Sequence, residues 1–125
     1  MMQVKLKNRK IKVFYPVETR SKPSVVINKR YIHSEASHGL WCYMLDQKLG
    51  ERLNDDTVGR EICVTMIVGY NSSIVELWEK LIIEYDSKTY KIKTKPDEYE
   101  YNKSDLKILA YEFNDDREYG GATYA

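Results

Sequence analysis

Apolar and polar residues alternate with a two-residue period along much of this chain, which is the pattern of half-buried β-strands. The clearest case lies on either side of Asp86-Ser87. The residues expected to share the buried face there are Leu81, Ile83, Tyr85, Tyr90, Ile92 and Thr94. Because Asp and Ser favour tight turns, we predict a β-hairpin over residues 84–94, at the centre of a small antiparallel barrel. No glycine is present at the turn, which leaves the turn type open.

Other segments carry strand patterns too. Residues 40–45 are apolar on both faces, which indicates a central strand. Residues 60–70 and 106–113 alternate, and each has at least one apolar face. Near the start, apolar positions change parity at Asn8-Arg9, which a turn or bulge would explain. A polar segment over 50–59 is predicted to be a loop, and an acidic segment over 96–104 another.

One short helix is predicted at about 73–80. Ser73 and Glu76 match a capping box, and apolar residues follow at helical spacing. The helix would close one end of the barrel with Leu77 and Trp78; a strand is the alternative, because Ile and Val are weak helix formers. The sequence therefore predicts an all-β fold: a small antiparallel β-barrel with one short helix and a long N-terminal loop, in a single domain over residues 1–125.

Residues 15–38 interrupt the strand pattern with Pro16, Pro23 and several serines, so we predict a long mobile loop. Within it, residues 25–32 could form a short hairpin turning near Asn28-Lys29, or a strand that orders only against a partner. An insertion with no role is the remaining alternative. At the other end, residues 114–125 are predicted to be a frayed tail.

The charge is unevenly distributed. The 125-residue chain has a formal net charge of +1, yet residues 1–30 carry about +8 and residues 97–118 about −5. Such a split can bind polyanions at one end, or let copies of the chain meet basic end to acidic end; a solvated surface is the plain alternative. The eleven tyrosines suit half-buried strands and contact surfaces.

Cys42 and Cys63 both lie in apolar strand-like segments, so we expect two buried thiols. A disulfide would need neighbouring strands and an oxidising compartment. No stretch is long and apolar enough to span a membrane, and the basic start has no apolar core of the signal-peptide type. We therefore expect synthesis and folding in the cytoplasm.

Catalytic and metal-binding patterns are missing from the sequence. His33 and His38 stand five residues apart in the predicted loop, far along the chain from Cys63. Cys42 with His38 would lack an orienting third group, and no glycine-rich phosphate loop occurs. We expect no enzyme activity, no metal and no cofactor. Basic residues interleaved with Tyr15 and Tyr31 would suit nucleic-acid binding, although such domains usually carry a strong basic excess.

The order of elements resembles the small head-closure and head–tail joining proteins of long-tailed bacteriophages and related prophages. The resemblance covers about residues 40–113: a Trp-containing strand, a loop, a long strand, a polar break, a hairpin and a final strand. In the hairpin, Lys88, Tyr90 and Ile92 match the family pattern, while Ser87 stands where glycine is usual.

The resemblance implies a β-barrel that assembles as a ring beneath the portal, extends or closes the DNA channel, and docks the tail. Expected partners are further copies of the chain, portal or adaptor protein, tail protein and packaged double-stranded DNA, with no membrane, at the head–tail interface of the virion. Tail completion and a nucleic-acid-binding module are the alternative functions. The candidate assembly or DNA-channel residues, all in the predicted loop, are Lys22, Val25, Val26, Ile27, Lys29, Arg30 and Tyr31.

Overall fold

The computed structural model describes residues 7–21, 24–45, 48–49, 62–99 and 102–125. Its elements, in chain order, are β1 (Arg9–Ser21), β2 (Ser24–Tyr31), a 3-10 turn (Glu35–Ser37), β3 (Leu40–Met44), β4 (Lys48–Leu49), β5 (Ile62–Gly69), α1 (Ser72–Leu77), β6 (Ile82–Tyr85), β7 (Lys88–Ile92), β8 (Asp97–Tyr99), β9 (Asn102–Phe113) and β10 (Gly121–Tyr124). The predicted loop over 50–59 and the residues before Lys7 fall outside the described residues.

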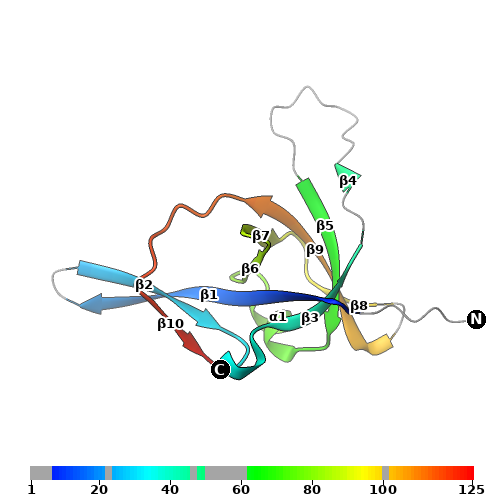
Figure 1. Cartoon of the computed structure of the whole chain (residues 1–125), viewed down its shortest axis with the longest axis horizontal. Helices are drawn as coiled ribbons and strands as arrows, with labels where there is room; N and C mark the ends of the chain where they lie inside the picture. Colours follow the sequence, from blue (N-terminus) through cyan, green and yellow to red (C-terminus); the bar gives the residue numbers. More distant parts are fainter. Residues whose placement is uncertain (1–6, 22–23, 46–47, 50–61, 100–101) are drawn as a thin grey trace, which may run out of the picture.

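Six strands close into an antiparallel barrel (Figure 1). The order around the barrel is β1, β3, β5, β9, β7 and β6, and β6 returns to β1 through the pair Val13↔Ile83. Closure leaves none of these six strands as a free edge over the paired segments. The predicted all-β barrel with one short helix is confirmed.

Alternating residues of the six strands point into the barrel and form its core. Its buried strand residues are Ile11, Val13, Cys42, Val64, Met66, Val68, Ile83, Tyr90, Ile92, Leu106, Ile108 and Ala110. Burial on every second residue is what the two-residue period requires. The predicted burial of Leu81, Ile83, Tyr90 and Ile92 is confirmed, whereas Tyr85 is half-buried and Thr94 is exposed.

The central hairpin turns where the sequence predicts. Tyr85 pairs with Lys88, so Asp86 and Ser87 are the two turn residues. Both have positive φ, 53° and 63°, which is the signature of a type I′ turn and matches the twist of the flanking strands. The opposite face of the hairpin, expected to be exposed to solvent, is buried at Ile82, which is 1% exposed.

Replacing Ser87 by Gly is expected to raise the free energy of unfolding by about 0.5–1 kcal/mol, because glycine adopts positive φ without the steric cost of a Cβ. Chemical denaturation measures the change. A loss of stability would show that the Ser87 side chain makes a contact worth more than the relief of backbone strain.

Helix α1 is shorter than predicted and is capped by a different residue. Asn71, not Ser73, is the N-cap, and its side chain accepts a hydrogen bond from the Ser73 N–H at 2.9 Å. Ile74 is fully buried, and Leu77 and Trp78 pack against the barrel core as predicted.

The two cysteines do not form a disulfide. Cys42 points into the barrel and pairs across the sheet with Val68. Cys63 lies five residues back along the neighbouring strand and on the opposite face, roughly 17 Å away at the usual rise per residue. The prediction of a buried thiol is confirmed for Cys42, whereas Cys63 is only half-buried.

In the native protein, Cys63 is expected to react with a thiol reagent faster than Cys42. Burial raises the pKa of the Cys42 thiol to about 11, so little thiolate is present at neutral pH. Mass spectrometry of partly labelled protein measures the two rates, with urea-unfolded protein, in which both should react alike, as the control. Equal rates under native conditions would contradict the burial of Cys42.

The prediction of a long loop over 15–38 is wrong for most of its length. Residues 15–21 continue β1, and β2 folds back on them with the register Tyr15↔Arg30 to Ser21↔Ser24. The chain therefore reverses between Ser21 and Ser24, not at Asn28-Lys29. β-Branched residues outweigh the two prolines here, and Pro16 lies beyond the last pair of β1 with β6, where β1 is an edge strand on that side.

The C-terminal segment is not a frayed tail. After an irregular stretch, β10 pairs in parallel with β2, from Gly121↔Asn28 to Tyr124↔Tyr31. In Figure 1 it runs beside β2, far from the strands that precede it in the chain. The predicted acidic loop over 96–104 also contains paired residues, since β8 folds against β9.

Candidate functional site

The most distinctive feature outside the barrel is a two-stranded arm, defined here as residues 15–21 of β1 and 24–30 of β2. Figure 1 shows it projecting from the side of the barrel. Near its tip, Val25 and Val26 are 55% and 36% exposed, and Val17, which pairs with Asn28 closer to the base, is 39% exposed. Ile27 is half-buried, and Lys22 falls outside the described residues. Three of the seven candidate residues predicted from the sequence, Val25, Val26 and Ile27, thus belong to the outer half of the arm.

The other three candidates lie at the base of the arm and are held within the chain. Lys29 Nζ donates to Glu84 Oε2 at 2.8 Å. The same ammonium lies 5.0 Å from the ring centroids of Phe14 and Tyr119, where the ring faces attract it. Arg30 Nη1 donates to the backbone oxygen of Tyr124 at 3.0 Å, which fastens β10 to β2.

Tyr31 connects the arm to the barrel wall. Its ring is 6% exposed and stacks on Tyr124, with centroids 4.8 Å apart and planes 7° from parallel. Its hydroxyl donates to Glu84 Oε1 at 2.8 Å. Burial, followed by this bond to a carboxylate, raises the pKa of the Tyr31 hydroxyl well above its ordinary value. The phenol therefore remains a hydrogen-bond donor across the physiological pH range.

These contacts surround a second apolar cluster on the outside of the barrel, which we call the outer cluster. Its buried members are Phe14, Tyr31 and Ile82, and its partly buried members are Phe113, Tyr119 and Tyr124. Successive residues Val13 and Phe14 are both 1% exposed because one faces the barrel core and the other the outer cluster. The C-terminal segment covers the outer cluster with Tyr119 and Tyr124.

Asp115 stabilises the start of the C-terminal segment that covers the outer cluster. Its carboxylate accepts hydrogen bonds from the Tyr119 hydroxyl at 2.6 Å and from Arg117 Nε at 2.9 Å. Burial alone would raise the pKa of the Asp115 carboxyl, but these two donors outweigh it and lower that pKa. Tyr119 is thereby aimed edge-on at Phe14, with ring centroids 5.6 Å apart.

Replacing Glu84 by Ala is expected to lower the free energy of unfolding by about 1–3 kcal/mol, because Lys29 and Tyr31 lose their common acceptor. The expected loss is modest because the side chains of Lys29 and Glu84 are 24% and 25% exposed, so solvent screens their attraction. Denaturant unfolding measures the loss, with the exposed Glu79→Ala as control. An effect no larger than that of the control would mean that Glu84 does not brace the arm.

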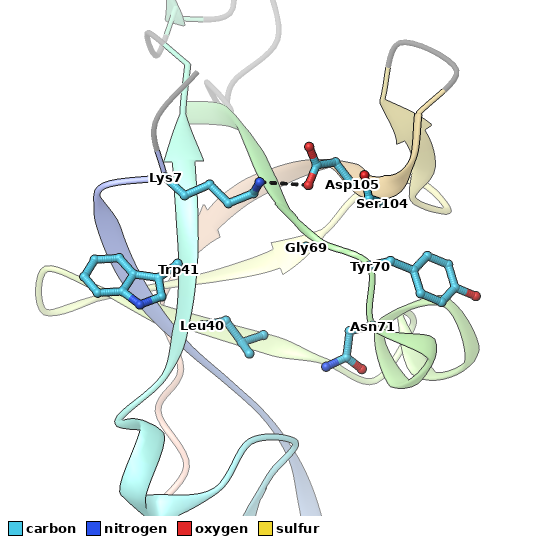
Figure 2. A pocket seen from close by; sticks show the side chains of 8 residues that line it. All are labelled: Lys7, Leu40, Trp41, Gly69, Tyr70, Asn71, Ser104 and Asp105. Atoms are coloured by element: carbon cyan, nitrogen blue, oxygen red, sulfur yellow. Dashed lines mark ion pairs between the residues drawn. The ribbon is translucent and has the colours of Figure 1, made fainter. Parts of the chain in front are cut away.

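A pocket of about 500 Å³ opens on the barrel wall away from the arm tip (Figure 2). Trp41 and Tyr70 flank it, and they are 54% and 53% exposed. Lys7 and Asp105 form an ion pair of 2.8 Å along one side. The prediction of a central strand over 40–45 is confirmed, since β3 lies between β1 and β5. The two apolar faces predicted there are not both covered, because Trp41 is exposed.

The described residues contain no group of three or more His, Cys, Asp or Glu placed to hold a metal ion. His33 is buried beside Tyr31 and Tyr124, with ring centroids 5.1 and 6.0 Å away, whereas His38 is exposed. Within the same described part of the chain, no helix has the length and hydrophobicity to cross a membrane.

In comparisons with known proteins, no family model and no curated protein matches this sequence.

Proposed function

We infer that this chain is a structural subunit of a head-closure or head–tail connector ring in a long-tailed bacteriophage or prophage. Copies of the chain would form a ring below the portal, extend or gate the DNA channel, and offer a docking face to the tail. The partners would be further copies of the chain, portal or adaptor protein, tail protein and packaged double-stranded DNA. The role is one of assembly rather than catalysis, at the head–tail interface of the virion.

The observation that carries this proposal is the arm. A closed barrel has no free edge along its paired strands for a neighbour's strand to pair with, so a projecting element is a natural contact surface. The arm provides one: among the described strands, its residues 15–21 pair only with β2, and its exposed valines are available to a neighbour. Its base is braced by Lys29, Tyr31 and Glu84, so it can present its tip with little loss of chain entropy.

The hairpin that carries the family resemblance contributes to the barrel and adds no contact surface. Tyr90 and Ile92 are 4% and 6% exposed, and Lys88 flanks the turn, so these matching positions serve the barrel itself. Lys29 and Arg30, expected to face DNA or acidic neighbours, make contacts within the chain instead. The proposed assembly therefore relies on the apolar tip of the arm.

Shortening the arm tests this function. Glu18 pairs with Ile27, so residues 19–26 can be replaced by Asn-Gly, which favours a two-residue hairpin turn. The shortened chain is expected to fold with the outer cluster intact. It is expected to lose assembly onto portal rings, whose gene the proposed function predicts beside that of this chain. Circular dichroism checks folding, and negative-stain electron microscopy detects the rings.

A matched control places the same Asn-Gly dipeptide at Asp86-Ser87, where the central hairpin already has a two-residue turn, and should leave assembly intact. Normal assembly of the shortened chain would make the arm a passive feature and remove the support for the proposal. DNA binding by the isolated chain that weakens steeply with salt, without any ring, would instead indicate a nucleic-acid-binding module.

A further inference from the structure

The pocket in Figure 2 arises where two barrel strands part. β3 and β5 pair from Cys42↔Val68 to Met44↔Met66. Beyond these pairs, Leu40 and Trp41 separate from the chain at Gly69 and Tyr70, and the pocket lies between them (Figure 2). A Cβ at Gly69 would meet no atom within 4 Å, so the pocket is open above this glycine.

The outer face of the barrel carries a short row of functional groups at this level. Lys10 pairs with Trp41, and Gly69 pairs with Asp105. Lys10 Nζ lies 4.8 Å from the Trp41 ring centroid, and Lys7 bridges to Asp105. The row is therefore a cation, an exposed indole, an open space and a carboxylate that is ion-paired with Lys7. It suits an apolar side chain accompanied by charged groups that join these charges.

The exposed large apolar side chains of the described residues fall into two sets. Val17, Val25 and Val26 lie on the arm, and Trp41 and Tyr70 lie at the pocket. Exposed apolar groups gathered in this way commonly mark interaction surfaces. Trp and Tyr in particular are enriched among residues that dominate binding energy.

The arm of a molecule cannot fill its own pocket. β1 carries both surfaces, since Lys10 pairs with Trp41 and Arg20 pairs with Val25. These levels are ten residues apart on one continuous strand, about 33 Å at the usual rise per residue. Figure 1 shows β1 running without reversal from the barrel into the arm. An arm that enters this pocket must come from another molecule.

We propose that the pocket flanked by Trp41 and Tyr70 binds the arm tip of a second copy of this chain. Val25 would cover the indole and the open space above Gly69. Charge complementarity supports this occupant, because Arg20 and Glu18 lie on the same face of the arm as Val25 and are exposed. Arg20 would share Asp105 with Lys7, and Glu18 would meet the exposed Lys10, whose ammonium also donates to the Ser37 carbonyl.

This contact joins two different surfaces, so it is heterologous and repeats from copy to copy until it closes as a ring or extends as a filament. The inference rests on the proposed function in one respect, which is that the contact closes into the connector ring. Pairing of arm with pocket can be tested apart from that closure.

The test uses two single variants of the full-length chain. Trp41→Ala removes the pocket platform and keeps the arm, and Val25→Glu changes the arm and keeps the pocket. In sedimentation equilibrium, the unchanged chain is expected to self-associate below about 1 mM, and each variant to do so at least tenfold more weakly. An equimolar mixture of the two variants is expected to form a one-to-one dimer that grows no further, because only one of its two possible contacts is intact.

Thr94→Glu, an exposed change off the arm, is the matched control and should associate like the unchanged chain; thermal unfolding verifies that all variants fold. A chain that stays monomeric to about 1 mM, variants that associate normally, or a mixture that stays monomeric would each overturn the inference. Rings on the portal formed by both variants would overturn the pocket contact and leave the proposed function standing. If the two variants weaken self-association but the unchanged chain forms no rings on the portal, the pocket contact stands and the proposed function is overturned.

Discussion

Replacing Phe14 by Ala is expected to lower the free energy of unfolding by about 3–5 kcal/mol, the usual loss for deleting a buried aromatic ring. Phe14 is 1% exposed at the centre of the outer cluster. It touches Tyr31 with ring centroids 5.5 Å apart, Tyr119 edge-on, and the Lys29 ammonium. The substitution therefore leaves a cavity where the arm, the barrel wall and the C-terminal segment meet.

Denaturant unfolding measures the loss, and hydrogen exchange should show that amides of β10 lose protection before those of the barrel. The exposed neighbour Lys12→Ala is the control and should change stability by less than about 0.5 kcal/mol. A Phe14 variant as stable as this control, or unaltered exchange in β10, would show that the outer cluster does not hold the C-terminal segment in place.

Replacing Ile92 by Ala is expected to cost about 2–5 kcal/mol, since most of a buried aliphatic side chain is removed from the barrel core. Ile92 is 6% exposed and pairs with Ala110, a small residue that leaves it room to pack. Strand β7 closes the barrel between β6 and β9, so a cavity at this position weakens both contacts.

Thr94→Ala, two residues further on and exposed, is the matched control and should be close to neutral. The comparison is made from denaturation midpoints at an unchanged slope, so that only stability differs between the variants. A loss below about 0.5 kcal/mol for Ile92→Ala would mean that the side chains of β7 face the other way.

The barrel was predictable from the sequence because its information is local. Alternation at Leu81, Ile83, Tyr90 and Ile92 assigns one face to the core, and Asp86-Ser87 has the turn chemistry to join the two strands. The exposure of Trp41 was not predictable in this way, because periodicity assigns residues to faces but does not tell which face a neighbouring element covers.

The arm and its C-terminal brace were missed for a related reason. β10 pairs with β2 across more than 90 residues of sequence, and neither segment shows on its own that the other exists. Pro16 and Pro23 indicated a loop, and Gly120-Gly121 a frayed end. Tyr119 and Tyr124 were the available signal, since two aromatic rings in a polar tail need apolar partners.

In the proposed assembly, the outer cluster and the arm have separate roles. The outer cluster fixes the direction of the arm, and the arm carries exposed valines away from the barrel. Bracing the arm before assembly lowers the entropy cost of the contact.

The connector function predicts a portal gene beside the gene of this chain, and electron microscopy of the chain mixed with that portal ring is its most direct test. The expected result is a ring of this chain on one face of the portal, with a central opening that continues the portal channel, and the absence of that ring when residues 19–26 are replaced by Asn-Gly. The contradicting result is a chain that stays monomeric beside an intact portal ring. The chain concentration in this experiment must be well above that at which the arm-to-pocket contact is expected to form.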